Sequence, residues 1–179
     1  MLSSSNAAAG ADWHREEVWR EDFLLVTAAS LPDVRTLQDL QKLAQSSTFV
    51  CYNPNYLDQQ RTESILSEIN LTPARRLPVS SSYEVMGLIA LSGGFGLLPP
   101  PNIWCGRAFF PTVRVQPIPA ASAPNRRMWA TGKASSALAQ TKFIAAQARQ
   151  QFAAFVQDAL TPACPGVSRY LHLANALSD

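Results

Sequence analysis

The stretch from residue 80 to residue 100, SSSYEVMGLIALSGGFGLLPP, constrains the fold more than any other part of this chain. Its middle has apolar residues at helical spacing, and Ser81 or Ser82 is a suitable N-cap. Gly93 and Gly94 follow, at the place where a left-handed residue commonly ends a helix. The next residues, FGLLP, are almost wholly apolar and predict a strand buried on both faces, as parallel strands are. The sequence therefore predicts a polar loop, a helix, a tight turn and a buried strand.

The rest of the chain continues the alternation of strands and helices. Its strand-like runs are residues 23–28, 47–52, 75–80, 112–118 and 126–132, and its helix-like runs follow Thr36 or cover residues 57–70 and 135–160. The last helix carries an apolar stripe of Phe143, Ile144, Ala148, Phe152, Phe155 and Val156. This alternation predicts an α/β fold, with a mostly parallel sheet and flanking helices.

Composition limits the classes of protein that this chain can belong to. With 179 residues, 47% of them hydrophobic, the chain is long enough for one ordinary domain with a core. The net charge is only +2 and the basic residues are scattered, so charge does not predict a nucleic-acid surface. The N-terminus lacks the pattern of a secretory signal, and no run reaches the roughly 18 apolar residues of a membrane span. We therefore expect a cytoplasmic protein with no membrane partner.

Residues suited to catalysis or metal binding are sparse. Cys51, Cys105 and Cys164 lie far apart without CxxC spacing, which indicates reduced thiols and no structural zinc site of the usual kind. His14 and His172 lie near the two ends, so no histidine triad or metal cluster is expected. An amidase or transferase of α/β type would need a nucleophile with a base, and GxSxG and phosphate-loop motifs are absent. We predict no enzyme activity, catalytic residue, metal or cofactor.

From Asp22 to about Val156, the chain resembles the C-terminal effector-binding (substrate-binding) domain of LysR-type transcriptional regulators. Four segments carry the resemblance in the family's order: FLLVTAASLPDVRTLQDLQKL, FVCYNPNYLDQQRTESILSEINLTP, SYEVMGLIALSGGFGLLP and RRMWATGKASSALAQTKFIAAQ. The third is similar to the family signature lVaaGlGialLP without a gap. It departs from that signature at Ser92, where the family has its first glycine, so Gly93 and Gly94 must end the helix.

The resemblance implies a fold like periplasmic-binding proteins of type 2, with two lobes and a small effector in the cleft between them. It also implies an N-terminal winged helix-turn-helix as the part that binds DNA, and a homo-oligomer in the full-length protein. Neither that part nor most of lobe one is in this sequence, so we expect an N-terminally truncated domain. Its expected parts are a flexible leader (1–21), lobe two (22–125), the returning strand and helix of lobe one (126–160) and a C-terminal tail (161–179). The returning helix, without most of its lobe, is expected to expose its apolar stripe.

Two polar loops are the candidate effector site. In open α/β sheets, ligands bind at the carboxyl ends of strands, where helix N-termini offer free N–H groups. Eight candidate residues follow strands in this way: Asn53, Pro54, Asn55, Tyr56, Ser80, Ser81, Ser82 and Tyr83. By resemblance, the first four match the lobe-two loop that faces the effector. Arg61, in the following helix, is a further candidate for contact with an anionic effector.

A structural interpretation of the same residues stays open beside the functional one. Serines before a helix are most often caps, Asn-Pro-Asn is most often a turn, and an arginine on an amphipathic helix more often faces solvent.

The predicted function is the effector-sensing domain of a bacterial LysR-type regulator, which binds a small anionic or polar metabolite and controls transcription through an absent DNA-binding domain. The alternatives are a solute-binding protein of the same fold and a truncated, non-functional regulator fragment. We expect the isolated chain to bind effector weakly or not at all.

Overall fold

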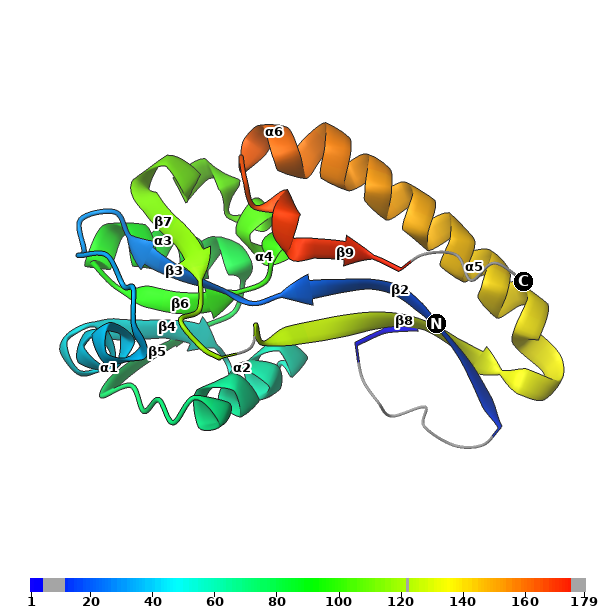
Figure 1. Ribbon diagram of the computed structural model, residues 1–179, viewed down its shortest axis with the longest axis horizontal. Coiled ribbons are helices and arrows are strands. Elements are labelled where there is room, and N and C mark those ends of the chain that lie inside the picture. The colour runs from blue at the N-terminus through cyan, green and yellow to red at the C-terminus, as the bar shows by residue number, and fades with distance from the viewer. Residues whose placement is uncertain (5–11, 122, 175–179) are drawn as a thin grey trace. The chain divides into compact units, whose positions relative to one another are not determined.

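A computed structural model describes residues 1–4, 12–121 and 123–174 of the chain (Figure 1). Two compact units form it. The central unit is Phe23–Pro124, and the flanking unit combines Met1–Asp22 with Asn125–Asp179. None of the described helices is long and apolar enough to cross a lipid bilayer.

The central unit is built on a five-stranded sheet with the strand order β5-β4-β6-β3-β7. The strands are β3 Leu24–Ala28, β4 Thr48–Tyr52, β5 Arg75–Val79, β6 Phe95–Leu98 and β7 Val113–Pro117. The helices are α1 Leu37–Ser46, α2 Leu57–Glu68, α3 Ser82–Ser92 and α4 Pro100–Cys105, and the 3-10 helix η1 covers Arg107–Thr112. Each strand predicted between residues 23 and 118 is therefore present.

The sheet is mixed, which corrects the expectation of a mostly parallel one. Strand β4 is parallel to both β5 and β6, whereas β3 is antiparallel to both β6 and β7. All four residues of β6 are buried. A strand that is buried on both faces has the same apolar sequence in a mixed sheet as in a parallel one, so the FGLLP run did not reveal the direction of its neighbour β3.

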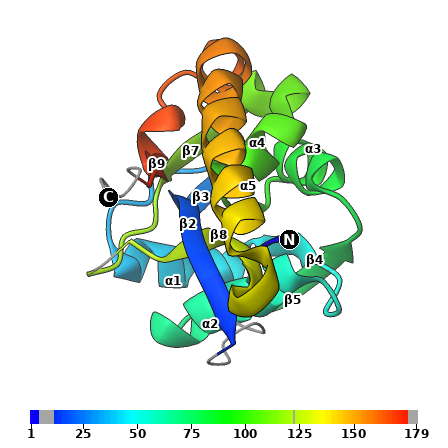
Figure 2. The ribbon, with the colours of Figure 1, turned by 90° about the vertical axis from the view of Figure 1, so that its right-hand side faces the viewer.

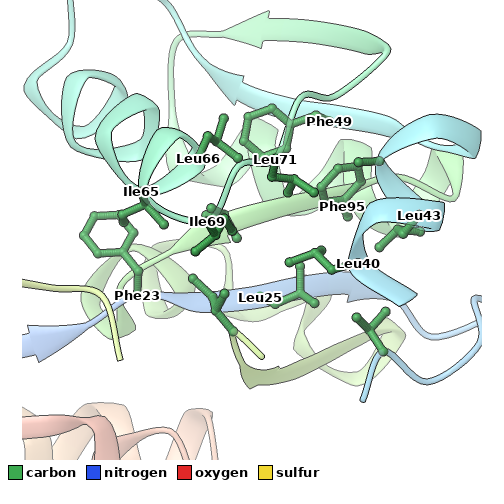
Figure 3. Packing of buried hydrophobic residues seen from close by; sticks show 14 of the residues in the cluster. Phe23, Leu25, Leu40, Leu43, Phe49, Ile65, Leu66, Ile69, Leu71 and Phe95 are labelled. Atoms are coloured by element: carbon green, nitrogen blue, oxygen red, sulfur yellow. The ribbon is translucent and has the colours of Figure 1, made fainter. Parts of the chain in front are cut away.

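The core of the central unit fills the space between the sheet and the helices α1 and α2. Leu40 and Leu43 of α1 and Ile65 and Leu66 of α2 lie in one cluster with sheet residues that include Phe95 (Figure 3). Because side chains alternate along a strand, the other residues of these strands face the opposite side, where α3 packs on β3 and β4. Helices therefore cover both faces of the sheet, and the strand ends are left for polar groups.

Side-chain caps begin two of the helices. Thr36 caps α1 in a capping box with Asp39, and Ser81 caps α3 in the same way with Glu84. Helix α3 ends at Gly93, whose φ of 72° is left-handed, as predicted from the glycine pair. These caps fix the residue at which each helix starts.

We expect Thr36→Ala to lower the free energy of unfolding by about 1 kcal/mol, because it leaves an amide at the start of α1 without its acceptor. The hydrogen bonds that Asp39 accepts from Thr36 hold the pKa of that carboxyl below its usual value. A carboxyl with a lowered folded-state pKa stabilises the fold above its unfolded-state pKa, and this contribution is lost as the pH falls through the folded-state value. The difference between parent and variant in urea unfolding should therefore shrink in acid. A difference that stays constant down to low pH would contradict this.

The flanking unit is an antiparallel sheet with one long helix against it (Figure 2). Its strands, in the order β1-β8-β2-β9, are β1 Leu2–Ser3, β8 Asn125–Lys133, β2 Trp13–Asp22 and β9 Leu171–Leu173. The helix α5 covers Ala134–Phe155 and continues through the π-helix η2 Val156–Leu160 into the short α6 Thr161–Ala163. After a turn, the 3-10 helix η3 covers Ser168–Tyr170. Trp19 stacks on Phe152 of α5 with ring centroids 3.9 Å apart.

The structure changes the expected division of the chain at both ends. Residues 13–21 were expected in a flexible leader, but they belong to β2, which pairs along its length with β8. The expected tail contributes β9, which pairs with β2 along the edge opposite to β8. Residues 5–11 and 175–179 of the expected leader and tail lie outside the described residues. The strand β2 was missed because the charged run WHREEVWRED lacks the alternation of a half-buried strand.

Only part of the predicted apolar stripe of α5 packs against the sheet. Phe152 and Ala148 contact Trp19 or the small core around Val18, whereas Phe143 and Ile144 are exposed. The expected exposed apolar surface on this helix is therefore present, but only at the Phe143 and Ile144 end of the predicted stripe.

Candidate functional site

The candidate site lies at one edge of the central sheet. Because β5 and β6 both run parallel to β4, the carboxyl ends of these three strands meet at the same edge. The helices α2, α3 and α4 follow these three ends, so their first turns lie there as well. This is the edge at which open α/β sheets place ligands.

The two loops predicted from sequence are in direct contact at this edge. The backbone N–H of Asn53 donates to the carbonyl oxygen of Val79 over 3.0 Å, and the Asn53 side-chain amide donates to Ser80 Oγ, also over 3.0 Å. Pro54, Asn55 and Tyr56 are exposed in the turn that leads into α2.

Three polar residues that the sequence analysis did not select join the loops. The Tyr52 hydroxyl lies 2.8 Å from Ser82 Oγ, and the Asn102 side-chain nitrogen donates to the Tyr52 hydroxyl over 2.7 Å. The same nitrogen donates to Asp58 Oδ2 over 2.8 Å. We call Tyr52, Asn53, Asp58, Ser80, Ser82 and Asn102 the carboxyl-edge cluster. Asn102 follows the strand end in LLPPPN, so the rule that selected the other two loops also applies to it.

Three of the predicted site residues have structural contacts elsewhere. Ser81 Oγ accepts a hydrogen bond from the backbone N–H of Glu84, so it acts as the cap of α3. The Tyr83 ring packs edge-on against Phe109 at 4.9 Å between centroids. The Arg61 guanidinium binds Glu68, the last residue of α2, over 2.9 Å. Ser81 is therefore a helix cap, as the structural interpretation of the serines expected, while Ser80 and Ser82 belong to the cluster.

Two hollows lie next to the cluster, and both include Pro78 of β5 in their lining. A cavity of about 540 Å³ includes Tyr52, Pro54 and Cys51 in its lining. A more open hollow of about 470 Å³ is lined by residues that include Ser80 and Tyr83. Both volumes lie in the range of small-molecule sites. Burial raises the pKa of the Cys51 thiol, with Arg76 acting in the opposite direction, so this thiol stays protonated and unreactive at neutral pH.

The cluster offers neutral hydrogen-bonding groups and one carboxylate. Hydroxyl and amide groups recognise polar ligands by hydrogen bonds and fix their orientation. Within the described residues, no group of three or more His, Cys, Asp or Glu side chains is placed to hold a metal ion.

The fold of this chain is similar to that of several solved structures. The regulatory domain of MetR, a LysR family regulator from N. meningitidis, superposes with a TM-score of 0.66 at 15% identity, over 98% of this chain and 75% of that domain. This chain therefore has the same fold as that LysR-family regulatory domain. It agrees with the α/β fold like periplasmic-binding proteins of type 2 that the sequence predicted.

Other solved structures have the same fold. A cysteine mutant of OxyR from Corynebacterium glutamicum has a TM-score of 0.66 at 21% identity and covers 86% of this chain. This chain covers 47% of that OxyR chain, so it spans about half its length. The effector binding domain of QuiR in complex with shikimate has a TM-score of 0.55 at 18% identity, over 79% of this chain and 64% of that one. No protein-family model matches the sequence, and no curated protein matches it.

Proposed function

We propose that this chain is the effector-sensing domain of a LysR-type transcriptional regulator and binds a small anionic or polar metabolite at the carboxyl-edge cluster. The observation that supports the proposal best is the cluster itself. Its side chains come from four helices and strands and two loops, and they gather at the sheet edge where ligands bind in this class of fold. The regulatory-domain fold supports the assignment to transcription rather than to catalysis.

The ligand would act by a shift between conformations. A ligand that binds one conformation of the domain more tightly than another shifts the equilibrium toward the conformation that it prefers. The size of the shift is limited by the difference between its affinities for the two conformations. In the proposed function, this shift is passed to a DNA-binding domain outside the present sequence, within a cytoplasmic homo-oligomer.

A titration of the ¹⁵N-labelled chain, followed by NMR, tests the proposed site. The probes are shikimate, benzoate, succinate and glucose, at millimolar concentrations because weak binding is expected. We expect at least one carboxylate probe to move the amide signals of Asn53, Ser80 and Ser82. Loss of one neutral hydrogen bond should weaken binding in Asn53→Ala and Ser80→Ala about three- to tenfold. The control is Ser64→Ala, on the exposed side of α2, which should leave binding unchanged.

Two results would overturn the proposal. One is the absence of any shift at the cluster with all four probes, and the other is equal binding by the Ser80→Ala and Ser64→Ala variants. A cellular experiment separates a regulator from a solute-binding protein of the same fold. Deletion of the gene should change transcript levels if the protein is a regulator, and should change only the uptake of the probe if it serves a transporter.

A further inference from the structure

Four members of the carboxyl-edge cluster form a continuous chain of hydrogen bonds. Asp58 in the first turn of α2 accepts from Asn102 of α4, Asn102 donates to Tyr52 at the end of β4, and Tyr52 bonds to Ser82 at the start of α3. The three distances are 2.8, 2.7 and 2.8 Å. Each member has its own inventory of donors and acceptors, so the direction of every bond in the chain can be worked out.

The carboxylate of Asp58 fixes the direction at one end. A carboxylate accepts hydrogen bonds and has none to donate, so the atom of Asn102 that faces it must be the amino nitrogen. The oxygen and nitrogen of an amide are otherwise assigned from the network around them. The same nitrogen is 2.7 Å from the Tyr52 hydroxyl, so the two amino hydrogens of Asn102 point to Asp58 and Tyr52.

The Tyr52 hydroxyl passes this direction on to Ser82. Its oxygen accepts from Asn102, and a hydroxyl that accepts from one neighbour donates best to the next, because bonds in such a chain polarise one another. Tyr52 is only 6% exposed, and both of these bonds are partly shielded from water. The Tyr52 hydrogen therefore points to Ser82 Oγ.

The serines at the start of α3 then act as donors. With this direction, Ser82 Oγ accepts from the Tyr52 hydroxyl 2.8 Å away. Ser80 Oγ accepts from the side-chain amide of Asn53 over 3.0 Å. A serine whose oxygen accepts from the protein keeps its own hydrogen for another acceptor. Both hydroxyls are thereby set to donate to a ligand at this edge.

We propose that Asp58, Asn102 and Tyr52 are positioning residues that orient the Ser82 hydroxyl as a donor. The ligand would offer a hydrogen-bond acceptor, a carboxylate or carbonyl oxygen, to Ser82 and Ser80. This inference rests on the proposed function of the same site and deepens it, because it names the chemical group that the site selects.

The test is a double-mutant cycle on shikimate binding, measured by the same NMR titration. Tyr52→Phe keeps the ring and removes the hydroxyl, and Ser82→Ala removes the final donor. Each single change should weaken binding about three- to tenfold, as expected for one hydrogen bond. If Tyr52 acts through Ser82, adding Tyr52→Phe to Ser82→Ala should cause no further loss. Ser82→Thr keeps a hydroxyl and should bind like the parent, and Tyr170→Phe in the flanking unit is the matched control.

Additive losses in the cycle, or parental affinity in Tyr52→Phe, would overturn the positioning role of Tyr52. An analogue of shikimate with an aminomethyl group in place of the carboxylate should not bind. Equal binding of that analogue would overturn the acceptor requirement.

A measurement without ligand separates this inference from the proposed function. The side-chain amide signals of Asn102 should shift in Tyr52→Phe and in Asp58→Asn, and stay in place in Tyr170→Phe. If shikimate does not bind the parent but these signals shift as expected, the proposed function fails for this probe and the hydrogen-bond chain stands. If the signals do not shift, the chain itself is wrong.

Discussion

Phe95→Ala is expected to lower the free energy of unfolding of the central unit by about 3–5 kcal/mol, the usual cost of a large side chain lost from a core. Phe95 lies in β6 and is 0% exposed. Its ring centroid is 5.1 Å from that of Phe49 in β4, and the cluster that holds both also takes in α1 and α2. A cavity here has strands beside it and helices above it, so the surroundings cannot easily collapse into it.

Urea unfolding followed by circular dichroism measures the loss, and hydrogen exchange shows which unit carries it. The amides of β4 and β6 should lose protection, because a cooperative unit opens as a whole. Phe143→Ala is the matched control, since that side chain is 66% exposed on α5. We expect the control to stay within about 0.5 kcal/mol of the parent. Similar effects of the two changes would show that Phe95 is not a core residue.

The local elements of the central unit could be predicted because their signals lie close together in sequence. The helix α3 is the clearest case, since Ser81 provides its cap and Gly93 its left-handed end, as the stretch from residue 80 to 100 indicated. The contact between the loops of Asn53 and Ser80 was also predictable. Both loops follow strands of one sheet, and the carboxyl ends of parallel strands share an edge.

Other features depend on contacts between distant residues, and the sequence pattern does not contain them. Asn102 reaches Asp58 across 44 positions and Tyr52 across 50, and nothing in its own neighbourhood indicates those partners. The direction of β3 was missed for a related reason. A strand covered by helices on both faces is apolar whichever way its neighbours run, so its residues do not report its direction.

Charged strands are the hardest elements to recognise. A half-buried strand usually alternates apolar and polar residues, but β2 has acidic and basic residues on both of its faces. It can bury some of these charges because they are paired with charges on neighbouring elements. Glu16 bonds to Arg149 of α5, and Glu21 bonds to Arg126 of β8. A charge that is neutralised across the sheet can be buried, and its residue then looks like part of a solvent-exposed run.

The pair of Glu21 and Arg126 gives the second large effect. Glu21 is 0% exposed, and the side chain of Arg126 is 15% exposed. Loss of one partner from a buried ion pair leaves the other charge in a medium that solvates it poorly, at a cost of about 3–5 kcal/mol. We therefore expect Arg126→Met to destabilise the flanking unit by that amount, with faster hydrogen exchange along β2 and β8. Urea unfolding of the full chain measures the change.

The neighbouring pair provides the control. Arg127 binds Glu17 over 3.3 Å, but its side chain is 52% exposed, and exposed pairs contribute about 0–1 kcal/mol. Arg127→Met should therefore have little effect, although it removes the same charge from the same strand. In Arg126→Met, the further change Glu21→Leu should recover much of the lost stability, because it removes the charge that burial penalises. Equal losses from Arg126→Met and Arg127→Met would mean that burial of the Glu21 carboxylate does not set the stability of this sheet.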